Sequence, residues 1–151
     1  MKITKLSKSG LDLIKQHEGF CSEPYLCPAS VGTIGYGSTY YEDGSKVKLG
    51  DPPITEERAS KLLANVVVAY EKSVDSFVRD DISQQQFDAL VCFAYNVGIG
   101  ALKSSTLLKK VNANPNDPTI RDEFLKWNKA AGKPLKGLTK RRESEAKLYF
   151  S

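Results

Sequence analysis

The feature that most constrains the fold is a long apolar repeat in the middle of the chain. Apolar residues recur at helical spacing through this stretch. Thr55 is suited to cap the start of the helix, and Glu56 and Glu57 lie in the first turn, where the helix dipole favours acids. A helix from Thr55 to about Arg79 would span roughly 36 Å. Because that is long for a chain of 151 residues, we expect a helix that joins two lobes.

The segments on either side of this helix differ in character. Residues 20–54 are rich in Gly, Pro, Tyr and Ser, and 31–36 and 39–41 are typical of short strands. Helical patterns fill the remainder, with start signals at Ser9, Ser83, Ser104 or Ser105, Asp117 and Thr139. The sequence therefore predicts an α+β fold in one domain, 1–151. A small antiparallel β lobe occupies about 20–54, and a mainly helical lobe comprises 1–19 and 55–151.

Several classes of protein are excluded by composition. No stretch approaches the ~20 apolar residues that span a bilayer, and the N-terminal lysines precede no apolar signal core. We expect the protein to accumulate in the cytoplasm of the cell that makes it. Three cysteines argue against a disulfide framework, although a Cys21–Cys27 bridge is geometrically conceivable. With one histidine and no Cys-x-x-Cys pair, we expect no metal and no cofactor.

Charge is unevenly distributed along the chain. Residues 101–151 carry twelve basic and five acidic side chains, net +7, whereas 55–100 carry four and seven, net −3. A basic C-terminal third predicts attraction to a polyanion. Nucleic acid, anionic lipid and bacterial cell wall all satisfy this signal, and charge alone does not choose among them.

Three reactive side chains fall within sixteen residues, where the pattern changes from helix to tight turns: Glu18, Cys27 and Thr33. Glu18 ends the first helix, where the negative end of the dipole favours the protonated carboxyl that a general acid requires. Cleavage of a glycosidic bond needs such an acid, and groups on the other face of the sugar that direct water. Each residue could instead be purely structural. Glu18 would then be a solvated carboxylate, Cys27 a cysteine in a turn, and Thr33 a β-branched strand residue.

The arrangement Glu18-x8-Cys27-x5-Thr33, with the run from Gly32 to Gly37, resembles the active-site segment of phage-type lysozymes of glycoside hydrolase family 24. Two later stretches are similar to the same family: 93–98 with 104–108, and Trp127 followed by 131–133 and 136–143. The resemblance covers nearly the whole chain in the expected order. It is therefore more specific than the short glycine-rich run alone.

The resemblance implies a two-lobed lysozyme-like fold and hydrolysis of the β-1,4 bond between N-acetylmuramic acid and N-acetylglucosamine in peptidoglycan. It makes Glu18 the general acid, while Cys27 and Thr33 position and activate the attacking water. Cys27 stands where most members have Asp. An ordinary thiol is mostly protonated at neutral pH, and an ionised Glu18 would raise its pKa further. We therefore expect Cys27 to give less electrostatic help than Asp, unless a local cation lowers its pKa.

The same resemblance implies an endolysin that lyses the host cell. Its substrate is bacterial peptidoglycan, and it has no nucleic acid partner and no stable membrane insertion. We expect a monomer that stays in the host cytoplasm until a holin releases it to the wall in the periplasm. Three alternatives remain: a lytic transglycosylase, a Cys–His peptidase using Cys27 and His17, and a non-catalytic wall-binding module. Tyr25 and Tyr36 are expected to pack or line the cleft, and Arg141 and Arg142 to form a solvated basic face or reach the cleft.

Overall fold

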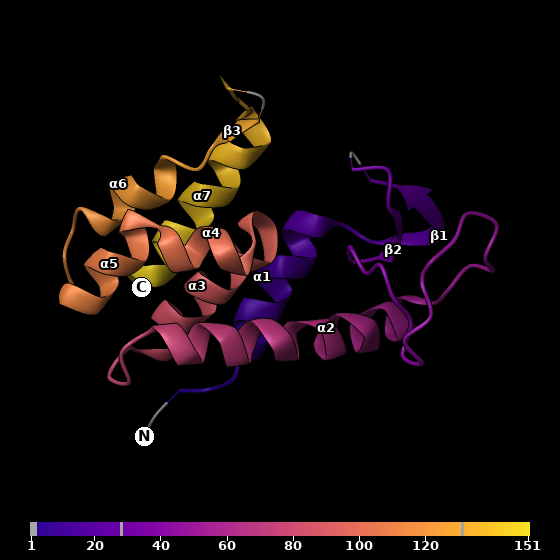
Figure 1. The fold of residues 1–151 in the computed structure, drawn as a ribbon, viewed down its shortest axis with the longest axis horizontal. Coiled ribbons are helices and arrows are strands. Elements are labelled where there is room, and N and C mark those ends of the chain that lie inside the picture. Colours follow the sequence, from indigo (N-terminus) through magenta and orange to yellow (C-terminus); the bar gives the residue numbers. More distant parts are fainter. Residues whose placement is uncertain (1–2, 28, 131) are drawn as a thin grey trace. The chain divides into compact units, whose positions relative to one another are not determined.

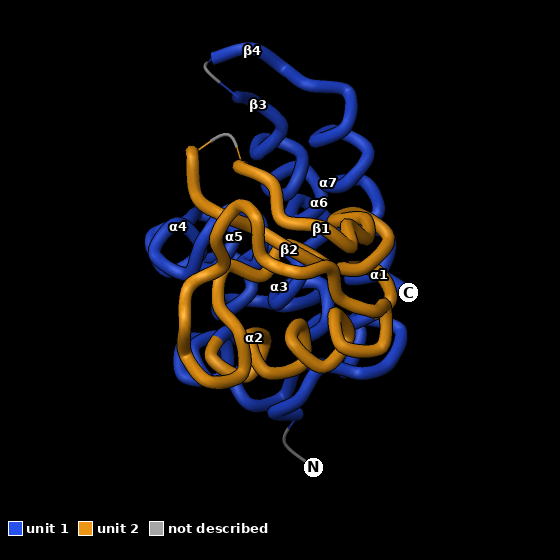
Figure 2. Tube along the Cα trace, turned by 90° about the vertical axis from the view of Figure 1, so that its right-hand side faces the viewer, with its two compact units in different colours: residues 1–11, 70–151 blue, residues 12–69 orange. Residues whose placement is uncertain are grey.

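The long central helix is present as α2, Glu56–Phe77. The computed structural model describes residues 3–27, 29–130 and 132–151. Figure 2 shows the chain divided into two units, of which unit 1 comprises Met1–Leu11 and Tyr70–Ser151 and unit 2 comprises Asp12–Ala69. Both α2 and the first helix, α1 (Lys8–Glu18), contribute residues to each unit. The predicted β lobe falls within unit 2.

Unit 2 is built around a two-stranded antiparallel sheet. Strand β1 (Cys21–Leu26) pairs with β2 (Gly32–Gly35), with Tyr25 opposite Thr33. The register shifts between Cys21 and Tyr25, a stretch that contains Pro24, which has no N–H to donate to the ladder. The β2 strand is almost fully buried. The predicted strand at 39–41 is reduced to a single bridge between Tyr40 and Lys46.

Unit 1 is mainly helical, and α3 lies at its centre (Figure 1). Helix α3 packs on α4 and α7, and α6 packs on α5 and α7. The helices are α3 (Gln84–Val97), α4 (Ile99–Ser104), α5 (Thr106–Ala113), α6 (Ile120–Leu125) and α7 (Lys136–Tyr149). A short antiparallel ladder of β3 (Lys129–Ala130) and β4 (Lys133–Pro134) precedes α7.

Aromatic side chains dominate the core of unit 1. Phe93 on α3 meets Phe124 and Trp127 edge-on, each with ring centroids 5.6 Å apart, and Phe124 meets Tyr149 at 5.8 Å. Such edge-to-face pairs add to the free energy gained by burial. They fix α7 against α3 and α6. Among the described residues, no helix combines the length and apolar character needed to cross a bilayer.

Local hydrogen bonds explain where the predicted helix boundaries were right and wrong. The capping box at Ser83 is confirmed, with reciprocal bonds to Gln86. The predicted cap at Asp117 is wrong: its carboxylate accepts from the N–H and hydroxyl of Thr119, which becomes the cap of α6. The last helix also starts three residues before Thr139, whose hydroxyl donates to the carbonyl of Leu135.

Candidate active site

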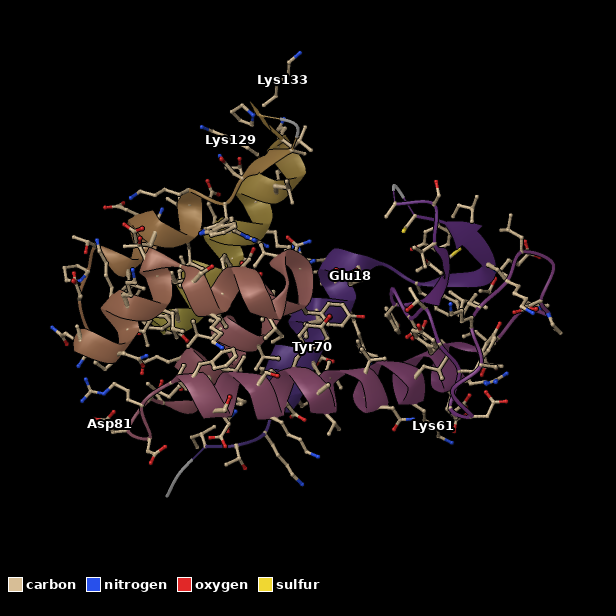
Figure 3. All side chains as sticks on the ribbon, viewed as in Figure 1. Glu18, Lys61, Tyr70, Asp81, Lys129 and Lys133 are labelled. Carbon is tan, nitrogen blue, oxygen red and sulfur yellow. The ribbon has the colours of Figure 1, made fainter. Side chains whose placement is uncertain are left out.

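Glu18 is the last residue of α1, where Figure 3 labels its side chain. Gly19 ends the helix at φ +72°, a conformation that glycine adopts without strain, and donates its N–H to the carbonyl of Lys15. In unit 1 the N-terminus of α1 is held by Asp88, which accepts from the N–H and the hydroxyl of Ser7. Both ends of the helix that carries Glu18 are therefore defined by specific contacts.

Cys27 lies directly after β1, in a tight connection to β2. Its N–H donates to the carbonyl of Val31 at 3.0 Å, and its own carbonyl accepts from Ser30 at 2.8 Å. Ser30 adopts φ +61°, the only described non-glycine residue with positive φ. The backbone of Val31 and of Ala29, in the same connection, acts on the sulfur of Cys27.

Backbone N–H groups lower the pKa of Cys27 below that of an ordinary thiol. The bond from Val31 contributes most, followed by Ala29, and the hydroxyl of Thr33 adds to the shift. Hydrogen bonds to the charged form favour ionisation. The net shift is therefore opposite in direction to the increase expected from Glu18 alone. Backbone amides provide the stabilisation that the sequence analysis sought from a local cation.

Thr33 is buried, with 3% of its surface exposed. Its hydroxyl donates to the carbonyl of Val31 at 2.9 Å and also contacts Cys27. A hydroxyl has one proton, so it donates either to the carbonyl or to the sulfur. Both predicted residues are brought together by the β1–β2 pairing.

Tyr25 lies close to both Glu18 and Cys27. Burial is the main cause that raises the pKa of its phenol, and charges on Cys21, Glu18 and Cys27 raise it further. Tyr25 is 37% exposed, so it retains access to solvent. Thr33 is therefore paired with Tyr25 near the end of β1, where Cys27 follows, and the charge of Glu18 acts on Tyr25 in the same unit.

The other cysteines do not belong to this group. Cys21, at the far end of β1, donates to the carbonyl of Glu23 at 3.2 Å. Cys27 follows Cys21 by six positions, or about 20 Å at strand spacing, which is too far for a disulfide. All three cysteines are free, and Cys92 is buried in α3. No cluster of metal-ligating side chains occurs among the described residues.

Unit 1 contains a buried ionic cluster that sequence reasoning misplaced. Arg141 and Arg142 are 4% and 0% exposed, so the prediction of a solvated basic face is wrong. Glu145, fully buried, pairs with Arg142 at 2.8 Å and with Arg141 at 3.2 Å. Arg142 also donates to Asn96 and stacks over Phe93. Burial lowers the pKa of Arg142 and raises that of Glu145. The i, i+3 and i, i+4 spacing of these charges was the available signal.

The phage lysozyme family model matches residues 15–145. This chain belongs to the phage lysozyme family. The match spans both units and includes Glu18, Cys27 and Thr33.

Relatives and solved structures agree with this assignment. The chain is 46% identical to the endolysin of Bacillus phage B103 over 148 residues, which cover 97% of this chain and 54% of the relative. It is 35% identical to the endolysin of Salmonella phage P22, covering 97% and 99% of the two chains. The chain thus spans about half the length of its relatives from Bacillus phages B103 and PZA.

The fold is that of a phage lysozyme. An endolysin from Escherichia coli O157:H7 phage FAHEc1 superposes with a TM-score of 0.88 at 36% identity, covering 100% of this chain and 97% of that one. A mutant of P22 lysozyme gives 0.86 at 34% identity, covering 99% and 100%. The α+β lysozyme-like class predicted from the sequence is therefore confirmed.

Proposed function

We propose that this protein is an endolysin with muramidase activity, which hydrolyses the β-1,4 bond between N-acetylmuramic acid and N-acetylglucosamine in bacterial peptidoglycan. The observation that carries the proposal is the match of residues 15–145 to the phage lysozyme family, a range that includes Glu18 and, on paired segments, Cys27 and Thr33. The site holds a carboxylic acid and a thiol whose pKa is lowered, and glycoside hydrolysis needs an acid on one face of the sugar and a group that activates water on the other.

In the proposed reaction, Glu18 donates its proton to the glycosidic oxygen as the bond to the anomeric carbon breaks. Positive charge develops on the sugar ring, and a water attacks the anomeric carbon. Cys27 and Thr33 position and activate that water. Because Thr33 is buried, we assign it the task of orienting the sulfur, while the more accessible Cys27 faces the water. The proton released from the water passes to the thiolate, and Glu18 is reprotonated from solvent.

The organisation around this activity is also proposed. The chain, 1–151, acts as a single catalytic domain, as a monomer, without a cofactor, a nucleic acid partner or stable membrane insertion. It remains in the host cytoplasm until a holin admits it to the cell wall. The family resemblance supports this route. Fractionation of cells that produce the protein with and without a holin tests it, since appearance outside the membrane without the holin would contradict it.

Replacing the acid tests the function directly. Glu18→Gln keeps the shape of the side chain but removes the proton, and should lower the rate of wall digestion by at least about a hundredfold. The matched control is Glu57→Gln, on the exposed face of α2 in the same unit, where the side chain is 82% exposed. That variant should digest walls at the native rate. Equal activity of the two variants would refute the role of Glu18.

The same experiment separates the alternatives. A lytic transglycosylase would release 1,6-anhydro sugars, and a wall-binding module would bind without clearing the suspension. A peptidase would survive Glu18→Gln. For the peptidase the structure offers little support, since the groups that lower the pKa of Cys27 are backbone N–H groups and a hydroxyl, with no imidazole among them.

A further inference from the structure

A dense run of lysines surrounds the β3–β4 ladder of unit 1. Residues 126–140 contain five lysines, and 124–142 contain no acidic residue. All five lysines are exposed, and we refer to Lys129, Lys133, Lys136 and Lys140 as the lysine surface. Lys126 is set apart because it pairs with Glu123 at 2.8 Å.

Hydrogen bonds hold this surface in a defined arrangement. Lys129 pairs with Pro134 and Ala130 with Lys133 in the ladder. The N–H of Leu135 donates to the carbonyl of Asn128 at 2.9 Å, and the Asn128 side chain donates to Thr139 Oγ1 at 3.0 Å. These bonds tie the ladder to the first turn of α7. Figure 2 shows the ladder extending beyond the helices of unit 1, and Figure 3 labels Lys129 and Lys133 there.

The lysine surface carries charge that the fold itself does not neutralise. In the described part of the chain none of its four lysines forms an ion pair, and the buried Glu123 is already shared between Lys110 and Lys126. Lys136 opens α7, where the helix dipole disfavours a cation, and no side chain caps that end. Lys136 and Lys140 are also a like-charged i, i+4 pair. Unfavourable local charge placements that no contact within the protein offsets point to a functional site.

We propose that the lysine surface binds the phosphodiester groups of a polyanionic glycopolymer of the bacterial wall. This inference rests on the proposed function, because it names a second component of the same substrate. Single ammonium groups on flexible stems suit a repeating phosphate chain, which they bind as point charges.

Other polyanions fit the surface less well. A single-stranded nucleic acid would favour exposed aromatic rings for stacking, but the nearby Trp127 is half-buried against Phe93. A membrane surface would favour several apolar side chains beside the cations, and here Leu135 is the one large apolar side chain of the described ladder and first turn that is classed as exposed. Charge without aromatic or apolar partners therefore favours the wall polymer.

The test measures binding separately from cleavage. The Glu18→Gln chain is sedimented with purified walls that carry the phosphodiester polymer, and with the same walls after the polymer is removed by hydrofluoric acid. Changing Lys129, Lys133, Lys136 and Lys140 to Gln should weaken binding at least about tenfold. A control with the same change in charge replaces the exposed Lys46, Lys48, Lys61 and Lys72 by Gln and should bind as before.

The chain that keeps its four lysines should lose the same amount of binding when the polymer is removed from the walls. Its binding to intact walls should weaken steeply with added salt. The melting temperature of the four-lysine variant should stay the same or rise, since Lys136 is unfavourable in the helix. Unchanged binding of that variant, equal binding to stripped walls, or stronger competition by DNA than by the isolated polymer would each overturn the inference.

The proposed function is judged by a different readout. With Glu18 restored, the four-lysine variant should cleave stripped walls at the native rate. If the native chain binds polymer-bearing walls through the lysine surface but cleaves none, the muramidase proposal fails while this inference stands.

Discussion

A close approach of two backbone segments in unit 2 allows a prediction of defined size. Gly32, the first residue of β2, lies so close to residue 47 that a Cβ at position 32 would be 2.2 Å from the carbonyl oxygen of Val47. Real Cβ atoms essentially never come within 3.0 Å of such an atom. Gly32→Ala must therefore separate the two segments by at least about 0.8 Å. The obstacle is backbone, so no change of rotamer relieves it.

Forcing an extra methyl group into a packed site costs about 1–3 kcal/mol. For a chain of this size that free energy corresponds to a fall in melting temperature of about 3–10 °C. Because Gly32 precedes Thr33, the displacement also shifts the hydroxyl that contacts Cys27. Gly32→Ala should therefore lose activity as well as stability. Urea denaturation followed by circular dichroism measures the loss of stability, and the clearing of wall suspensions measures the loss of activity.

The matched control adds the same methyl group where space is open. Gly100, in α4, has no atom within 4 Å of an added Cβ. Alanine is the better helix former, so Gly100→Ala should be neutral or stabilise the chain by up to about 1 kcal/mol. If Gly32→Ala unfolds within about 0.5 kcal/mol of the native chain, the close approach to Val47 does not constrain the site.

Two further predictions concern ionisable groups. Because the pKa of Cys27 is lowered, its thiolate should persist below the pH at which an ordinary thiol titrates, and should be lost as the pH falls through the lowered pKa. The ultraviolet absorbance of the thiolate, with that of the Cys27→Ser variant subtracted, measures this titration. A midpoint at or above that of a free thiol would contradict the prediction. Glu145→Gln leaves Arg142 buried without its carboxylate and should lower the free energy of unfolding in urea by about 3–5 kcal/mol. Glu42→Gln breaks an exposed pair and should lower it by less than about 1 kcal/mol. Similar losses of stability in the two variants would show that burial does not set the cost.

The elements predicted well from sequence are those whose signals are local. The repeat that produces α2 and the capping box at Ser83 are read from neighbouring residues alone. The strand β1 was missed because Pro24 weakens its pattern, and its pairing with β2 is a tertiary event. Helix α4 was missed because Gly98 and Gly100 signal a break, yet Gly98 merely turns the chain at φ +101°.

The site shows the same division. The types and spacing of Glu18, Cys27 and Thr33 are visible in the sequence, and their spacing carries the family resemblance. The state of Cys27 was not predictable, because its pKa is lowered by backbone N–H groups of Ala29 and Val31, which all residue types except proline possess. Side-chain patterns cannot reveal how backbone groups change the pKa of a nearby sulfur atom.

The most direct test of the central claim follows oxygen from water into the product. Purified walls are digested in water enriched in the heavy isotope of oxygen, and the released fragments are analysed by mass spectrometry. The native chain should yield fragments with a reducing N-acetylmuramic acid end that carries one heavy oxygen, and Glu18→Gln should yield almost none. Anhydro-ended fragments without heavy oxygen, or cleavage of peptide bonds alone, would contradict the account.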